Sequence, residues 1–291
     1  MNTLAASALI LGGHIGSLQA STIGTGFVFH PDGYIMTSNN NLIVERKSAN
    51  GTKNRTTCKN IGVKLGEKVG MAEVVARDNV NRLAVIKVNP KDFRRTNRYR
   101  SVPIVHLPRR SRAGWVNFND IGTYRVSSNS NIVGKQKERE RDEGALHYLS
   151  FSNRSSNPGD NIVLLGYPLI STVSSTLKIH SGIVSSTVGW HNNSSQIQID
   201  AATNSGSAGG PVMDIFGNVV AIHLATFDKH RIGERIRTAR GFGFSVKSSI
   251  ATQFLDVSNI DYPRRRPQSS MSMAELYERA RKSVALIYCS D

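Results

Sequence analysis

The stretch that decides the fold is IQIDAATNSGSAGGPVMDIFGNVVAI, which runs from Ile197 to Ile222. Short apolar runs typical of strands lie at its two ends, at Gln196 to Ile199 and at Val219 to Leu224. Between them is a tight turn rich in glycine and serine, Gly206-Ser207-Ala208-Gly209-Gly210. Strands joined by such turns indicate a β-rich domain.

The same texture extends outward from Ile23 to Ile250, with Pro31-Asp32-Gly33 as a further turn signal. Besides the two runs above, short segments that fit strands are Thr25 to Phe29, Tyr34 to Thr37, Ile61 to Leu65, Met71 to Ala76, Leu83 to Val88, Asn161 to Leu165, Gly182 to Ser186 and Gly243 to Val246. Many short strands at this spacing predict an all-β barrel or sandwich.

The bulk composition excludes several classes of protein. The chain has 291 residues, of which 39% are apolar, so it can bury a real core. It has no apolar run of 18 residues, so we expect no membrane span. It has neither a glycine-rich phosphate loop between a strand and a helix nor a metal-ligand spacing, so we expect no cofactor and no metal.

The two cysteines and the N-terminus bear on the compartment. Cys58 and Cys289 are far apart in the sequence and do not indicate a disulfide framework or a metal site. A single disulfide between them is an alternative. We therefore favour an intracellular or organellar protein over a secreted one. The N-terminal residues resemble a signal peptide weakly, because they lack its basic region. A strand over Ala5 to Leu11 is the preferred interpretation.

The net charge of +16 is clustered in sequence. The stretch from Asn89 to Pro158 is long, basic and only patchily apolar, which is typical of a functional or disordered insertion. Its basic patch comprises Arg94, Arg95, Arg98, Arg100, Arg109, Arg110 and Arg112. Aromatic residues interleave with it, so the patch favours either nucleic-acid binding or a merely solvated basic loop.

The last thirty residues have a different pattern. Residues 262 to 291 read as a linker followed by a short tail. Ser272-Met273-Ala274-Glu275 is a capping-box pattern, and apolar residues follow it at helical spacing. We predict a short C-terminal helix to about Arg281 and a strand over Ser283 to Tyr288.

Four segments, in order, resemble the Deg/HtrA branch of the trypsin-like serine proteases. The central stretch is similar to that family's I-Q-T-D-A-A-I-N-x-G-N-S-G-G-P. The other three are GTGFVFHPDGYIMTSNNNLI from Gly24, DNVNRLAVIKV from Asp78 and GDNIVLLGYP from Gly159. The resemblance implies two six-stranded antiparallel β-barrels in one domain over residues 1 to 261. Barrel one would span about 20 to 90, the basic insertion about 89 to 158, and barrel two about 159 to 250.

The tail also resembles this family, whose protease domain opens with a helix that leads into a strand. Ala274 to Ile287 is similar to that opening segment. Either the chain ends where a truncated second copy begins, or the tail packs on the domain. The forty residues after barrel two leave no room for the PDZ domain that usually follows.

The positions of the catalytic triad are all changed. Carried over from the family motifs, the histidine position falls on Asn40, the aspartate position on Arg82 and the serine position on Ala208. An amide cannot act as a general base, a guanidinium reverses the charge that should stabilise imidazolium, and a methyl group is no nucleophile. We therefore expect a pseudoprotease. The backbone N–H groups of Gly206 and Ala208 would keep a vestigial oxyanion hole.

Four functions compete at this point. The first is binding of a peptide or partner protein in the vestigial site. The second is association with nucleic acid through the basic patch. The third is assembly with active relatives as a regulatory subunit, because the resemblance implies a homo- or hetero-oligomer, such as the family's trimer. The fourth is true endopeptidase activity, which the missing triad disfavours.

Overall fold

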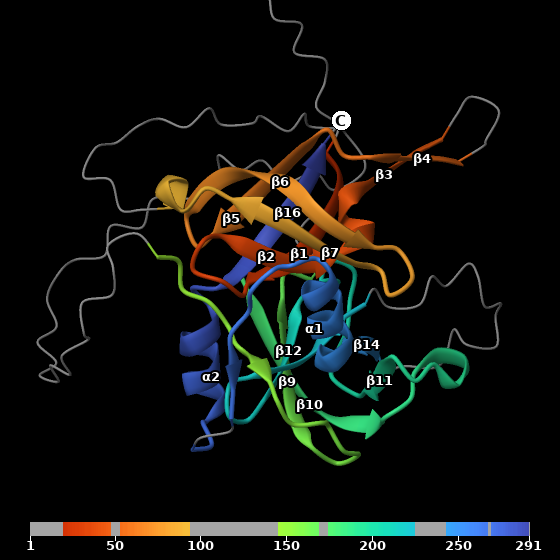
Figure 1. Ribbon diagram of the computed structural model, residues 1–291, viewed down its shortest axis with the longest axis vertical. Coiled ribbons are helices and arrows are strands. Elements are labelled where there is room, and N and C mark those ends of the chain that lie inside the picture. Colours follow the sequence, from red (N-terminus) through yellow and green to blue (C-terminus); the bar gives the residue numbers. More distant parts are fainter. Residues whose placement is uncertain are drawn as a thin grey trace, which may run out of the picture.

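Two β-barrels dominate the computed structural model, which describes residues 20–47, 53–93, 145–168, 174–224, 243–266 and 269–290 (Figure 1). Barrel one closes in the order β1 (Ala20–Val28), β16 (Val284–Ser290), β5 (Asn60–Leu65), β6 (Lys68–Asp78), β7 (Leu83–Val88) and β2 (Tyr34–Ser38). Every neighbouring pair in it is antiparallel.

Barrel two has six strands as well. Their order is β12 (Pro211–Asp214), β9 (Asn161–Gly166), β10 (Lys178–Ser186), β11 (Gln196–Ile199), β14 (Gly243–Lys247) and β13 (Val219–His223), and the pairing of β12 with β13 closes it. The short strands β8 (Phe151–Ser152) and β15 (Arg264–Arg265) extend this sheet in parallel beside β13. The predicted all-β, trypsin-like double barrel is thus confirmed.

The remaining elements lie outside the two barrels. Strands β3 (Ile43–Lys47) and β4 (Lys53–Thr57) form a hairpin of their own. The helices are α1 (Ser248–Val257) and α2 (Met273–Ala280), with short 3-10 turns η1 (Asn39–Leu42), η2 (Pro90–Phe93) and η4 (Trp190–Asn192). Helix α2 confirms the predicted C-terminal helix, including its capping box.

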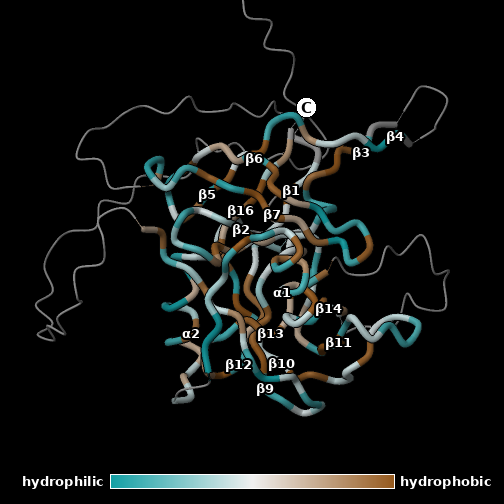
Figure 2. The backbone as a smooth tube through the Cα atoms, in the orientation of Figure 1, coloured by the Kyte–Doolittle hydropathy of each residue, from teal (hydrophilic) through white to brown (hydrophobic). Residues whose placement is uncertain are grey.

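The core is continuous across both barrels. One cluster of buried side chains joins Phe27 and Met36 of barrel one with Phe151, Val163 and Ile222 of barrel two. Separate clusters fill the rest of each barrel. In Figure 2 hydrophobic segments follow the barrel strands, whereas connecting turns are more hydrophilic. Because the two barrels share this core, their facing surfaces are held together by apolar burial.

The C-terminal strand is part of barrel one. Strand β16 lies between β1 and β5, and both pairings are antiparallel (Figure 1). The expected range of about 20 to 90 for barrel one therefore lacks one of its strands. Helix α2 packs on the shared core through Leu276 and Ala280.

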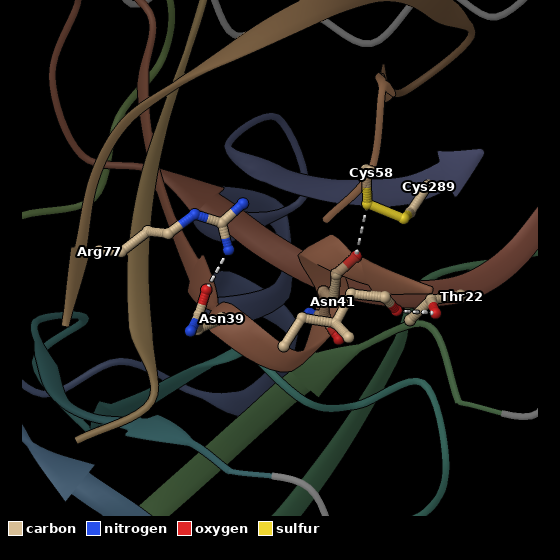
Figure 3. The surroundings of a disulfide bond; sticks show 7 residues. Thr22, Asn39, Asn41, Cys58, Arg77 and Cys289 are labelled. Carbon is tan, nitrogen blue, oxygen red and sulfur yellow. Dashed lines mark hydrogen bonds between the residues drawn. A yellow bond between two sulfur atoms is a disulfide. The ribbon is translucent and has the colours of Figure 1, made fainter. Parts of the chain in front are cut away.

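A disulfide fixes this strand. Cys58, which follows β4, is bonded to Cys289 of β16, with their Cα atoms 5.6 Å apart (Figure 3). Both cysteines are buried. The two cysteines thus form one structural crosslink, which the sequence left open.

Candidate functional site

The turn that carries Ala208 is fastened to barrel one by hydrogen bonds. The Thr25 N–H donates to the carbonyl oxygen of Ala208 over 2.9 Å. The Thr25 hydroxyl donates to the Gly206 carbonyl over 2.6 Å, and the buried Asn41 amide donates to Ala208 O over 2.8 Å. Bonds from one barrel to the turn of the other fix the course of the backbone at the junction.

Glycine is required within this turn. Gly209 has a φ of +82°, which L side chains rarely adopt, and a Cβ there would meet Thr25 O and lie 2.6 Å from Ser38 N. Its N–H donates to His223 O over 2.8 Å. The backbone of the turn therefore lies so close to the backbone of barrel one that no side chain fits at Gly209.

The three positions predicted to match the triad can be located relative to η1. Asn40 lies in η1, whose N-cap Ser38 accepts a hydrogen bond from the Asn40 N–H over 3.4 Å. The neighbouring Asn39 N–H donates to the Arg82 carbonyl over 2.8 Å. On the other side of Asn40, the Asn41 amide contacts Ala208 O, as described above. The backbone carbonyls of Arg82 and Ala208 thus contact the two residues that flank Asn40.

Arg82 does not place its charge as the sequence suggested. Its side chain is exposed, its φ is +59°, and its contact with η1 is made by the backbone. A different cation, Arg77 of β6, donates to the Asn39 side chain (Figure 3). The Asn39 amide donates in turn to Asn79 over 2.8 Å.

Arg77 was not singled out from the sequence. One of its guanidinium nitrogens, Nη2, is buried and has no hydrogen-bond partner among the described residues, and burial lowers the pKa of the side chain. A partly desolvated guanidinium beside the histidine position disfavours a second cation there.

The two predicted oxyanion-hole donors are free of main-chain partners. Within the described part of the chain, neither the Gly206 N–H nor the Ala208 N–H donates a backbone hydrogen bond, whereas Ser207 N–H bonds to Asn204 O over 3.0 Å. Gly206 has a φ of +97°, and a Cβ there would meet the Tyr167 carbonyl. Two unpaired N–H groups on one glycine turn can stabilise a carbonyl or carboxylate oxygen.

The neighbouring serines do not replace the missing nucleophile. Ser207 is 1% exposed, and its Oγ has no hydrogen-bond partner among the residues described. Ser205 is exposed at the start of the turn. Neither hydroxyl has a hydrogen bond to a histidine in the described ranges, so neither has the base that activates a serine.

Sequence reasoning also missed a buried histidine beneath the turn. His223 is fully buried, its Nδ1 lies 3.4 Å from the Ser245 hydroxyl, and its Nε2 has no partner among the described residues. Burial lowers the pKa of His223 to about 3, so the ring is neutral. Its backbone carbonyl accepts a hydrogen bond from Gly209 N–H, and its N–H donates to the Gly210 carbonyl. Its place at the end of β13 was visible in the sequence, but a lone histidine in an apolar strand carries no functional pattern.

Other predicted features remain without structural description or bring no site together. The basic patch from Arg94 to Arg112 and the expected strand over Ala5 to Leu11 lie outside the described residues. Across the described ranges there is no cluster of three or more histidine, cysteine or acidic side chains that could hold a metal ion. In the same ranges no helix is long and apolar enough to span a bilayer.

Comparison with known proteins agrees with this geometry. Residues 24–222 match the family described as trypsin-like peptidase domain. The matched region covers most of the chain and includes Asn40, Arg82 and Ala208. The chain therefore belongs to the trypsin-like peptidase domain family.

Individual relatives are of the Deg/HtrA type. "Serine endoprotease DegS" of Salmonella typhimurium is 31% identical over 109 residues, which are 36% of this chain and 29% of the relative. A "Probable periplasmic serine endoprotease DegP-like" of Brucella suis is 36% identical over 115 residues, 38% of this chain and 20% of that protein. The chain thus matches less than a third of the length of either relative.

Solved structures of this type are also similar. The serine endoprotease from Yersinia pestis has a TM-score of 0.45 and 19% identity, covering 81% of this chain and 57% of that one. The HtrA-type protease AlgW with a decapeptide has a TM-score of 0.47 and 20% identity, covering 81% and 51%.

Proposed function

We propose that this chain is a protease homologue that does not cleave peptides and instead binds a peptide or partner protein at the vestigial site. The observation that carries the proposal is the meeting of Asn40, Arg82 and Ala208 around η1 on an intact backbone framework. The framework is the part of a protease that binds, and the triad is the part that cuts.

The chemistry available at the site supports the loss of cleavage. A triad needs a hydroxyl, a base that takes its proton and a carboxylate that orients the base. At the three corresponding positions this chain has an amide, an exposed arginine and a methyl group. Without a triad, what remains is substrate binding and oxyanion stabilisation, roughly 10³ to 10⁴ over water, which is too slow for a working protease.

The free N–H groups of Gly206 and Ala208 support the binding half of the proposal. In a trypsin-like fold such donors face the carbonyl oxygen of a bound peptide, and an extended peptide adds main-chain hydrogen bonds beside them. Because the turn is already fixed to barrel one by Thr25 and Asn41, binding costs little further ordering.

The first experiment restores the triad. The natural chain and the triple variant Asn40→His, Arg82→Asp, Ala208→Ser are compared for hydrolysis of denatured casein and for labelling by a fluorophosphonate. We expect no turnover by the natural chain and detectable labelling of the triple variant. The double variant that keeps Ala208 is the matched control and stays unlabelled. Turnover by the natural chain would contradict the proposal.

The second experiment measures binding. Titration of a fluorescent peptide library into the natural chain is expected to give ligands that compete with one another at physiological salt. A substitution that blocks the site, Ala208→Trp, should abolish this binding, whereas Lys282→Gln on the exposed turn before β16 should not. Loss of all peptide binding at physiological salt in the natural chain would defeat the binding half of the proposal.

A further inference from the structure

A polar pocket lies on barrel two, away from the triad positions. It has a volume of about 450 Å³, within the range of small-ligand sites, which is roughly 300–1,000 Å³. Its walls come from the residues after β8, the end of β14, the first turns of α1 and the strand β15. Three cationic side chains line it, Arg154, Lys247 and Arg264.

The start of α1 points to an anion. The first N–H groups of a helix have no partner within the helix, and they carry a partial positive charge. Here the N-cap residue is Lys247, which provides no capping hydrogen bond, and the first turn has no acidic residue. A cation at this end of a helix is unfavourable unless an anion balances it.

A serine that lines the pocket and has no hydrogen-bond partner for its hydroxyl gives an independent indication. Ser248, the first residue of α1, is 6% exposed and lines the pocket. No hydrogen bond of its hydroxyl is found among the described residues, whereas the neighbouring Thr252 hydroxyl donates to Ser249 O over 3.1 Å. The Ser248 oxygen is not among the fully buried atoms without a partner, so the hydroxyl is accessible and can donate to a ligand in the pocket.

Of the three cations that line the pocket, Lys247 has no acidic partner among the described residues and can bind an anion. Arg154 is paired with Asp160 over 2.7 Å, and Arg264 lies 4.0 Å from Asp256. In the described ranges no carboxylate lies within 4.0 Å of the Lys247 ammonium. The pocket therefore joins one unpaired cation, two paired arginines, a free hydroxyl and a helix N-terminus.

We propose that this pocket binds a tetrahedral oxyanion, a phosphate group. Phosphate accepts hydrogen bonds from amides, hydroxyls and cations at once, which is the donor set present here. The phosphate is either the free ion or a phosphate monoester on a small molecule or side chain. This site is independent of peptide binding at Ala208.

The test uses the full chain and calorimetry at constant ionic strength. Inorganic phosphate, phosphoserine and chloride are titrated into the natural chain and into Lys247→Gln, Ser248→Ala and Lys282→Gln. We expect phosphate or phosphoserine to bind and chloride not to bind. Loss of one charge-assisted hydrogen bond, about 1.5–3 kcal/mol, should weaken binding by Lys247→Gln about tenfold or more. Tighter binding of phosphoserine than of phosphate would identify a monoester as the source.

A second variant separates binding from folding. Lys247→Asp places an anion at the N-cap itself, so it should raise the melting temperature without phosphate and remove the response to phosphate. Lys282→Gln, exposed and away from α1, should bind phosphate as the natural chain does. Absence of phosphate binding, or an equal response to chloride, or equal weakening by Lys282→Gln, would overturn the proposal.

Discussion

At the residue scale, the buried His223 gives the protein a pH dependence. Its pKa is lowered to about 3 by burial, against 6.5 for a free histidine. Between these values the unfolded chain binds a proton that the folded chain does not, so stability rises with pH through this window and is complete above pH 6.5. Acidification from pH 6.5 should therefore destabilise the fold, by up to roughly 1.4 kcal/mol per pH unit from this group.

The variant His223→Leu tests this assignment. The difference in unfolding free energy between pH 7 and pH 5, measured by urea denaturation, should shrink relative to the natural chain. His180, whose pKa burial and Lys178 also lower, contributes in the same direction and is present in both proteins. His191→Asn, at an exposed position, should keep the natural slope. An unchanged slope in His223→Leu would refute the role of the buried ring.

Single residues show where sequence reasoning succeeds and where it stops. Asn40, Arg82 and Ala208 were assigned because each lies within a motif with fixed spacing, and this assignment stays a prediction. The exposed side chain of Arg82 could not be foreseen, because it depends on a φ of +59° between β6 and β7. Arg77 and His223 belong to no motif, and only their burial against η1 and the glycine turn marks them.

At the element scale, the pattern of apolar residues along the sequence predicted most of the strands. The ten strands predicted between Thr25 and Val246 all form, and nine of them bury apolar side chains in a barrel. The exception is β6, which has no buried residue and is held by its pairing with β5 and β7. Strands β3 and β4 were missed because their sequences, IVERK and KNRTT, are mainly polar and pair only with each other. Helix α1 was missed because its N-cap is a lysine, which is no start signal.

The capping box of α2 is the element whose contribution can be tested most directly. The Ser272 hydroxyl accepts from Glu275 N–H over 3.3 Å, and the Glu275 carboxylate accepts from Ser272 N–H over 2.8 Å. Removing an N-cap hydroxyl costs about 1 kcal/mol. We expect Ser272→Ala to lower the unfolding free energy by that amount in urea denaturation, because α2 packs on the shared core through Leu276 and Ala280.

The exposed Ser270 provides the control for this substitution. It lies two residues before the cap and has no part in the capping box. Ser270→Ala should leave stability within the error of the measurement. If both alanine variants had the same stability as the natural chain, α2 would contribute nothing through its cap.

At the scale of the whole molecule, barrel one is built from the two ends of the described chain. Strand β16 is antiparallel to β1, and Ser290 lies opposite Ala20 in their register. The end of β16 is therefore next to the start of β1, which is the arrangement of a β-hairpin without its turn. Strand β16 thus lies between β1 and β5, although it comes last in the described chain.

This arrangement predicts that the chain tolerates a change in the order of its segments. A chain in which residues 269–290 precede residues 20–266, joined by an Asn-Gly turn, should fold with the same barrels, because every pairing of β16 with β1 and β5 is kept. The Cys58–Cys289 disulfide should form in it, which thiol counting under denaturing conditions would show. Deletion of residues 269–290 without replacement should instead prevent folding, because it leaves β1 and β5 unpaired and exposes the core beside Val284 and Leu286. Circular dichroism and thermal unfolding separate the two designs, and a rearranged chain as unstable as the deletion would show that β16 does not complete the barrel.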